Sequence, residues 1–336
     1  MHIPDNYLSP ATCAVLGGVM VPFWAGAARR LRRTLEPGRM PLLGLAAAFC
    51  FLLMMFNLPA PGGTTVHPLG GTLAAVLLGP WAACLAMSAA LLVQALVFGD
   101  GGILAYGANC FNMALVVPAL GCLLFHLLRR FLGRGRGQWL ALGLAAYLAI
   151  NLGALCAAVE FGLQPVLARD AAGLPLYCPY PLAVTLPGML LPHLLVAGWV
   201  EAGFTVAVYA FLARVAPERL RREGPVRAEV LYGLVVALVC LCPLGLLARG
   251  SAWGEWAPGE LARLALGGKP LGFVPARMAL GRVLAAPLDG YALPGLPAWA
   301  GYLLAALAGA SVLVILGKLA GRGRAARGQA KDGGTP

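Results

Sequence analysis

The chain has 336 residues, of which 60% are hydrophobic and only 11% charged, and its formal net charge is +12. Soluble domains contain about 45–50% apolar residues, so this composition excludes an ordinary soluble protein. The positive charge does not indicate nucleic-acid binding, because most Lys and Arg residues fall in four short segments beside apolar stretches, at 29–39, 129–136, 214–227 and 318–331. We therefore predict an all-α, polytopic membrane protein.

Eight apolar stretches each reach or approach the ~20 residues that a helix needs to cross ~30 Å of hydrocarbon. In chain order they are residues 8–28, 41–60, 70–98, 107–128, 138–163, 188–212, 228–247 and 297–316. Because cytoplasmic loops are rich in Lys and Arg, the basic segments place the N-terminus, residues 57–68 and residues 100–106 outside, and the C-terminus inside.

Residues 70–98 then have to cross the membrane an even number of times. Gly79-Pro80 interrupts this stretch, and a break of this kind is tolerated where the chain is buried in protein or lines a site. We predict a short or re-entrant helix, a break and a longer helix, which gives about nine passes in all.

The first apolar stretch has an alternative interpretation as a cleaved signal peptide, because Ala25-Gly26-Ala27 resembles a small-residue cleavage site. No basic region precedes this stretch, Asp5 lies there instead, and its arginines follow the apolar run. This arrangement favours an uncleaved helix with its N-terminus outside.

A basic, polar linker divides the chain into two modules and a tail. We assign residues 1–216 to the first module, 217–227 to a cytoplasmic linker, 228–318 to a second module and 319–336 to a disordered basic tail. The second module has two apolar helices around a long outside loop. Glu255 lies in this loop, and the sequence gives it no particular role.

Two histidines, His2 and His67, fall on the same predicted outer face. A free N-terminus followed by His offers the Met1 amine, the His2 amide nitrogen once deprotonated, and the His2 imidazole. These nitrogens are nearly coplanar because the peptide unit is planar, so they suit metals with square-planar or tetragonal coordination. His67 can supply a fourth nitrogen. Nickel fits this geometry best, copper would bind tightly and cobalt is possible, although a lone His at position 2 is usually not a ligand.

Four further polar residues are candidates to support these ligands. Asn109 and Asn112 follow the outside loop and could hydrogen-bond a ligand histidine, or they could cap a helix end. Thr64 and Thr65 could do the same or only satisfy a turn.

Glu201 falls near the middle of an apolar helix, eight residues after His193. A carboxylate is costly to bury in a membrane, so such a residue is a functional candidate. A structural polar contact is an equally open interpretation for Glu201 and His193.

Three segments carry a resemblance to a known family: MHIPDNYLSP at 1–10, PGGTTVHPLGG at 61–71, and FGDGG at 98–102 with GANCFNM at 107–113. Residues 1–215 resemble the CbiM/NikM family, the substrate-binding S components of energy-coupling-factor importers for cobalt and nickel. The resemblance implies Met1, His2 and His67 as metal ligands and a prokaryotic plasma membrane as the location. It also implies a transmembrane coupling (T) subunit and ATP-binding subunits as partners. The second module is similar to the small CbiN/NikN subunit.

Other functions find less support in the sequence. The chain has no GxxxxGK[ST] phosphate loop, so we expect ATP hydrolysis in partner subunits, and it has no HExxH or CxxCH motif of a membrane metalloenzyme or haem protein. A stand-alone secondary permease would need ionisable groups along a pathway, and only Glu160 and Glu201 qualify. We therefore expect a capture subunit for Ni²⁺ or Co²⁺ that contacts membrane lipid, binds no nucleic acid, needs no organic cofactor and is not an enzyme.

Overall fold

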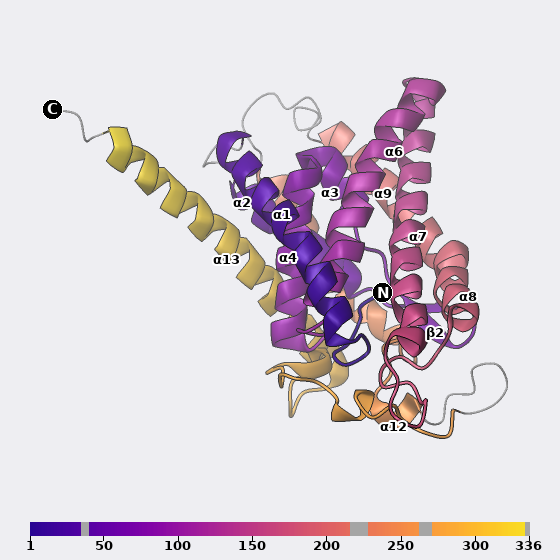
Figure 1. The fold of residues 1–336 in the computed structure, drawn as a ribbon. Helices are drawn as coiled ribbons and strands as arrows, with labels where there is room; N and C mark the ends of the chain where they lie inside the picture. Colours follow the sequence, from indigo (N-terminus) through magenta and orange to yellow (C-terminus); the bar gives the residue numbers. More distant parts are fainter. Residues whose placement is uncertain (35–39, 216–227, 262–270, 333–336) are drawn as a thin grey trace.

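The computed structural model describes residues 1–34, 40–215, 228–261 and 271–332. The chain forms a bundle of helices, and its first residues lie inside this bundle (Figure 1). The basic ends of α1 (Pro10–Thr34) and α6 (Val117–Leu132) lie at the top of Figure 1, and the loop after residue 248 lies at the bottom. The basic ends of these two helices therefore lie at the same end of the bundle, as the sequence predicts.

Seven helices in the described ranges are long and apolar enough to cross a membrane, which confirms an all-α polytopic protein. They are Pro10–Thr34, Pro80–Phe98, Tyr106–Leu132, Arg136–Leu167, Leu182–Val215, Glu229–Leu247 and Ala298–Gly323. A shorter apolar helix, α2, spans Met40–Met54.

Several of these spans consist of more than one helical segment. Three contain π-helical turns, and one ends in a 3₁₀ helix. The segments are α4 (Pro80–Val93) with Gln94–Phe98, α5 (Tyr106–Asn109) with Cys110–Val116 and α6, α8 (Leu182–Pro192) with His193–Ala197 and α9 (Gly198–Val215), and α11 (Ala228–Leu241) with Cys242–Leu247. The remaining helices are α7 (Arg136–Leu167), α12 (Pro258–Leu261) and α13 (Ala298–Asp332), with short 3₁₀ turns at Met278–Leu280 and Asp289–Tyr291.

The predicted break at Gly79-Pro80 is confirmed. Helix α3 (Gly71–Leu78) is only about 12 Å long at 1.5 Å per residue, so it cannot cross a bilayer alone. Gly79 has a φ of 91°, and Pro80 begins α4, where its missing N–H leaves no hydrogen bond unmade. Because Gly71 is buried, the loop before α3 enters the bundle and brings His67 inside.

That loop contains a small β-hairpin that the sequence analysis did not predict. Strand β1 (Leu58–Ala60) pairs antiparallel with β2 (Thr64–Val66), with Leu58 opposite Val66. The turn uses Gly62 and Gly63, whose φ values of 90° and 73° are accessible to glycine at little cost. The hairpin ends directly before His67 and so fixes the direction from which this side chain approaches.

The C-terminal region differs from the predicted disordered tail. Helix α13 continues through residues 319–332, because Ala, Arg, Lys and Gln are good helix formers and propagate a helix that begins in the membrane. The predicted linker at 217–227 lies outside the described residues.

The second module docks on the first through close helix packing. Helix α13 packs along α2, and a Cβ added at either Gly44 or Gly317 would overlap the backbone of the opposite helix. The Tyr302 hydroxyl also donates to the Met55 carbonyl at 2.6 Å. Small residues let helix backbones approach in this way where hydrophobic association is weak.

We predict that Gly317→Leu lowers the thermal stability of the detergent-solubilised protein. The side chain would force α13 away from α2, and overpacking of this kind costs about 1–3 kcal/mol. The matched control is Gly323→Leu on the same helix, where an added Cβ meets no atom within 4 Å. Equal melting temperatures for the two variants would contradict the close packing of α13 on α2.

Candidate metal centre

The N-terminal segment, residues 1–9, is an irregular stretch of chain with a turn at Asp5 and Asn6, and side chains of other elements hold it inside the bundle. We call it the N-terminal strand. Asn109 binds both sides of Ile3: its Oδ1 accepts from the Ile3 amide at 2.8 Å, and its Nδ2 donates to the Ile3 carbonyl at 3.0 Å. The Gly102 amide donates to the same carbonyl at 2.8 Å. Met1 and His2 are buried as a result, with exposed fractions of 3% and 2%.

The loop at residues 99–104 can approach this strand because Gly102 has no side chain. A Cβ at Gly102 would overlap the backbone of Pro4 and Asp5. Asp5 then closes the contact, since its Oδ1 accepts from the Leu104 amide at 2.8 Å. The strand is therefore fixed on either side of His2.

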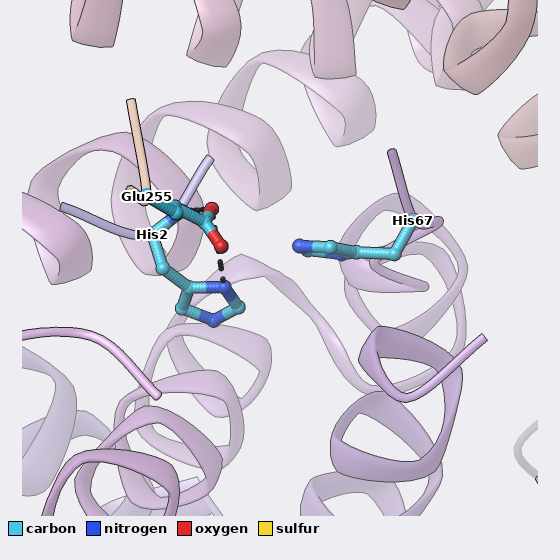
Figure 2. A group of neighbouring side chains, drawn as sticks. All are labelled: His2, His67 and Glu255. Carbon is cyan, nitrogen blue, oxygen red and sulfur yellow. Dashed lines mark hydrogen bonds and ion pairs between the residues drawn. The ribbon is translucent and has the colours of Figure 1, made fainter. Parts of the chain in front are cut away.

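The three nitrogens of the predicted chelate converge on one carboxylate oxygen. Glu255 Oε1 accepts from the Met1 ammonium at 3.0 Å and from the His2 amide at 2.9 Å, and it lies 4.0 Å from His2 Nδ1. Figure 2 shows this carboxylate between the His2 backbone and its imidazole, with the edge of the His67 ring pointing toward it. Glu255 Oε1 thus lies opposite the same three nitrogens that a chelated ion would bind.

The carboxamide of Gln94 and the carboxylate of Asp100 orient the His2 ring. Nε2 lies 3.4 Å from Gln94 Oε1, and Nδ1 lies 3.3 Å from Asp100 Oδ1. A proton on Nε2 donates to Gln94 and leaves the lone pair on Nδ1, which is the nitrogen that closes a six-membered chelate ring. Gln94 is itself held by the Tyr291 hydroxyl, to which its Nε2 donates at 3.1 Å.

His67 faces His2 across the site, with ring centroids 5.0 Å apart. Its Nδ1 lies 3.3 Å from the Pro68 carbonyl oxygen, so a proton on Nδ1 leaves Nε2 free to bind a metal. Nε2 is buried and has no hydrogen-bond partner. Burial, reinforced by the nearby N-terminal ammonium and His2, holds the pKa of His67 well below its usual value. The ring is therefore neutral, as a ligand must be.

Glu201 fixes the backbone immediately after His67. Its carboxylate accepts from the Leu69 amide at 2.7 Å and from the Gly70 amide at 3.0 Å. Gly70 has a φ of 71° and precedes α3, so the carboxylate satisfies backbone donors where the chain turns into the helix. Glu201 therefore contacts the backbone two and three residues after the candidate ligand His67.

Among the described residues, one group of His, Cys, Asp and Glu side chains has the spacing to hold a metal ion. Its members are His2, His67 and Glu255, whose ligand atoms all lie within 4.8 Å of one another. His67 Nε2 is buried without a hydrogen-bond partner, and such an orphaned nitrogen fits a site for an ion. His2 Nδ1 faces the carboxylates of Asp100 and Glu255, at 3.3 and 4.0 Å. A cavity of about 720 Å³ reaches this group, and carboxylates of Asp5, Asp100 and Asp289 line it.

A comparison with known protein families identifies the family of the chain. Residues 2–219 match the family described as the cobalt uptake substrate-specific transmembrane region, CbiM. The chain belongs to the CbiM family. Residues 227–325 match a PDGLE domain, so the second module follows the CbiM region directly. As a CbiM family member with seven long apolar helices, the protein is a multi-pass protein of the prokaryotic plasma membrane.

Full-length relatives and solved structures agree with this family. A protein of Lactiplantibacillus plantarum named probable fused nickel transport protein LarMN is 48% identical, and the alignment covers 94% of this chain and 96% of the relative. The fused nickel transport protein NikMN of Rhodobacter capsulatus is also 48% identical, over 94% of this chain and 95% of its own. A crystal structure of a truncated transition metal transporter matches with a TM-score of 0.61 and 47% identity, covering 64% of this chain and 99% of that one.

The polar residues that the sequence analysis proposed as supports for the metal ligands differ in what they contact. Asn109 contacts the backbone next to His2 and not an imidazole. Asn112 donates to Glu160 at 2.8 Å, and His193 Nδ1 lies 2.7 Å from the Met189 carbonyl oxygen within its own helix. Thr64 donates to the Ser251 carbonyl at 3.2 Å. Thr65 forms a parallel bridge to Ala252, so both threonines join the hairpin to the second module.

Three residues at the site were not identified from the sequence: Gln94, Asp100 and Glu255. Asp100 and Glu255 lie in outside loops, where acidic side chains are ordinary, and Gln94 is a lone polar residue at the end of an apolar stretch. They could have been identified only from knowledge that they lie close to His2 in space. Sequence spacing carries no such signal for residues more than ninety positions apart.

We predict that Glu201→Gln lowers the affinity for Ni²⁺ or Co²⁺ about 10- to 100-fold, the usual effect of removing a group that orients a metal ligand. The amide keeps one acceptor oxygen and turns an NH₂ group toward the Gly70 amide, which now contacts both carboxylate oxygens, so the turn after His67 is less firmly held. Isothermal titration of the purified protein measures the affinity. Glu229→Gln, at an exposed position at the start of α11, is the control, and a wild-type affinity for Glu201→Gln would contradict the positioning role.

Proposed function

We propose that this protein is the membrane subunit that captures divalent nickel or cobalt for an ATP-driven importer of the energy-coupling-factor type. The ligands in this proposal are the Met1 amine, the deprotonated His2 amide, His2 Nδ1 and His67 Nε2. The observation that supports it is the convergence of the three N-terminal nitrogens on one point, opposite a buried and unpartnered His67 nitrogen.

Nickel is the preferred substrate in this proposal. Four nitrogens in a plane suit Ni²⁺ because it accepts square-planar coordination with nitrogen ligands. The two full-length relatives with 48% identity are both named as nickel transport proteins. A cobalt transport protein CbiM of Moorella thermoacetica is more distant, at 39% identity over 51% of this chain.

Energy for transport comes from partner subunits in this proposal. A coupling subunit in the membrane would connect this protein to ATPases and reorient it to release the ion. Helix α1 offers a surface for such a partner, because Ala14 and Gly18 are exposed and an added Cβ at Gly18 meets no atom within 4 Å. Small residues allow close helix contact within a membrane.

A stand-alone permease is less well supported. The two carboxylates that could form its pathway both have structural partners: Glu201 binds the backbone beside His67, and Glu160 accepts from Asn112. A metalloenzyme is also disfavoured, because a planar set of four nitrogens leaves no equatorial position for a water or a substrate.

We predict that His2→Gln abolishes one-to-one binding of nickel or cobalt. The substitution keeps the amine and the amide but removes the imidazole, so the six-membered chelate ring cannot close. Metal content and visible absorption of the purified protein measure the loss. The control is His126→Gln at an exposed position of α6, and unchanged metal binding in His2→Gln would place the site elsewhere.

We also predict that the metal affinity rises with pH between about 5 and 8, because the amine and the amide each lose a proton when they bind the ion. His67 contributes little to this rise, because burial already holds the pKa of its ring low. Competition with a coloured chelator across this pH range measures the affinity. A flat profile would contradict ligation by the amine and amide.

A further inference from the structure

Glu255 brings a carboxylate from the second module to the first two residues of the chain. It lies 254 positions from Met1 in sequence, yet one of its oxygens accepts hydrogen bonds from both the Met1 ammonium and the His2 amide. The side chain of Met1 is fully buried, whereas that of Glu255 is 20% exposed. The carboxylate therefore covers two buried donors and is itself in contact with the cavity.

These donors need a partner when no metal is bound. A buried ammonium without a counter-charge is costly, and a buried N–H without an acceptor costs about 1–3 kcal/mol. The other charged group near this end of the strand, Asp100, contacts His2 Nδ1 rather than the amine. Among the described residues, Glu255 forms the ion pair with the N-terminus.

The backbone that carries Glu255 is firmly anchored. The Trp253 ring packs against Phe161 and Tyr180, with centroids 5.9 and 6.2 Å apart. Gly254 has a φ of 84°, and a Cβ there would press on the Phe161 ring, so the chain passes close to α7 before it reaches Glu255. The carboxylate is thus presented from a fixed point.

The same anchor contacts both segments that carry candidate ligands. The Tyr7 hydroxyl, from the N-terminal strand, donates to the Trp256 carbonyl at 2.6 Å. Thr65, two residues before His67, forms the parallel bridge to Ala252. Residues 252–256 therefore connect the strand of His2 to the strand of His67.

We propose that Glu255 is a positioning residue whose oxygen takes the place of the ion in the metal-free protein. It holds the Met1–His2 strand in the conformation that binds metal, and the arriving ion displaces it toward the cavity. An oxygen 2.9–3.0 Å from two nitrogens and a metal at about 2.0–2.1 Å from the same nitrogens cannot occupy the site together. This inference rests on the proposed function, because it takes those nitrogens as the ligands.

The first test is hydrogen exchange of the backbone amides of residues 3–9 in the metal-free protein. In Glu255→Ala these amides should exchange at least about tenfold faster than in the wild type, because the strand opens locally without its partner. After metal is added, the wild type and the variant should exchange alike, because the ion then holds the strand. Exchange in α7 should be unchanged throughout, which separates loosening of the strand from general unfolding.

The second test is metal binding, with Ni²⁺ as the probe. Glu255→Ala should bind Ni²⁺ about tenfold more slowly, because the strand is no longer held in the binding conformation. At equilibrium it should bind no more weakly than the wild type, because a group that the ion displaces stabilises only the metal-free state. Glu255→Gln, which keeps an acceptor oxygen but no charge, should bind at a rate between those of Glu255→Ala and the wild type. Glu260→Ala is the control, because its carboxylate is exposed and binds Ser251 and Ala257 in the same loop.

The outcomes distinguish this inference from the proposed function. Wild-type strand exchange in metal-free Glu255→Ala would overturn the positioning role, as would association of Ni²⁺ at the wild-type rate or faster, since the carboxylate would then only obstruct the site. A lower equilibrium affinity of Glu255→Ala would overturn the displacement by the ion, because the carboxylate would then contact the bound metal. Failure of the wild type to bind Ni²⁺ or Co²⁺ would overturn the proposed function instead. In that case, faster strand exchange in the metal-free variant would still show that Glu255 holds the N-terminus.

Discussion

The placement of a charged chain terminus inside a helix bundle is the constraint on which the rest of the site depends. An ammonium in a region of low dielectric must be paired and hydrogen-bonded, and here Glu255 provides both the charge and the acceptor. The strand that follows is equally well satisfied. Ile3 is bound by Asn109 and Gly102, and Asp5 by the loop at 99–104. Without these partners the N-terminus would remain in water.

The position of His67, on the other side of the site, is fixed by different contacts. His67 stands where a hairpin turns into a half-helix, and the buried carboxylate of Glu201 satisfies the backbone donors at that turn. The break before Pro80 allows this geometry, because a short helix followed by a long one lets the loop enter the bundle and return. The His67 imidazole therefore faces the N-terminal strand across the site. Residues 252–256 contact both the segment that carries His67 and the N-terminal strand.

Much of this architecture could be predicted from local signals. Apolar length and the distribution of arginines indicated the helices and their direction, and Gly79-Pro80 indicated the interrupted pair. The chemistry of an amine next to a histidine indicated a chelate, and the shared face of His2 and His67 brought them together. The contributions of Gln94, Asp100 and Glu255 could not be predicted, because they depend on how segments far apart in the sequence pack together. The continuation of α13 beyond residue 318 was missed because a basic composition does not distinguish a disordered tail from a helix that is already nucleated.

The contacts of the N-terminal strand with residues 255–256 and 281–283 also set an order of assembly. Asn6 donates to the Gly281 carbonyl, and Asp5 accepts from the Val283 amide, so the beginning of the chain docks on segments made near its end. At ~5–20 residues per second of synthesis, the first residues wait on the order of 10–60 s before these partners exist. During that interval the amine and His2 lack these partners. The candidate metal centre is therefore completed late in biosynthesis, when the last-made module closes over the residues that were made first.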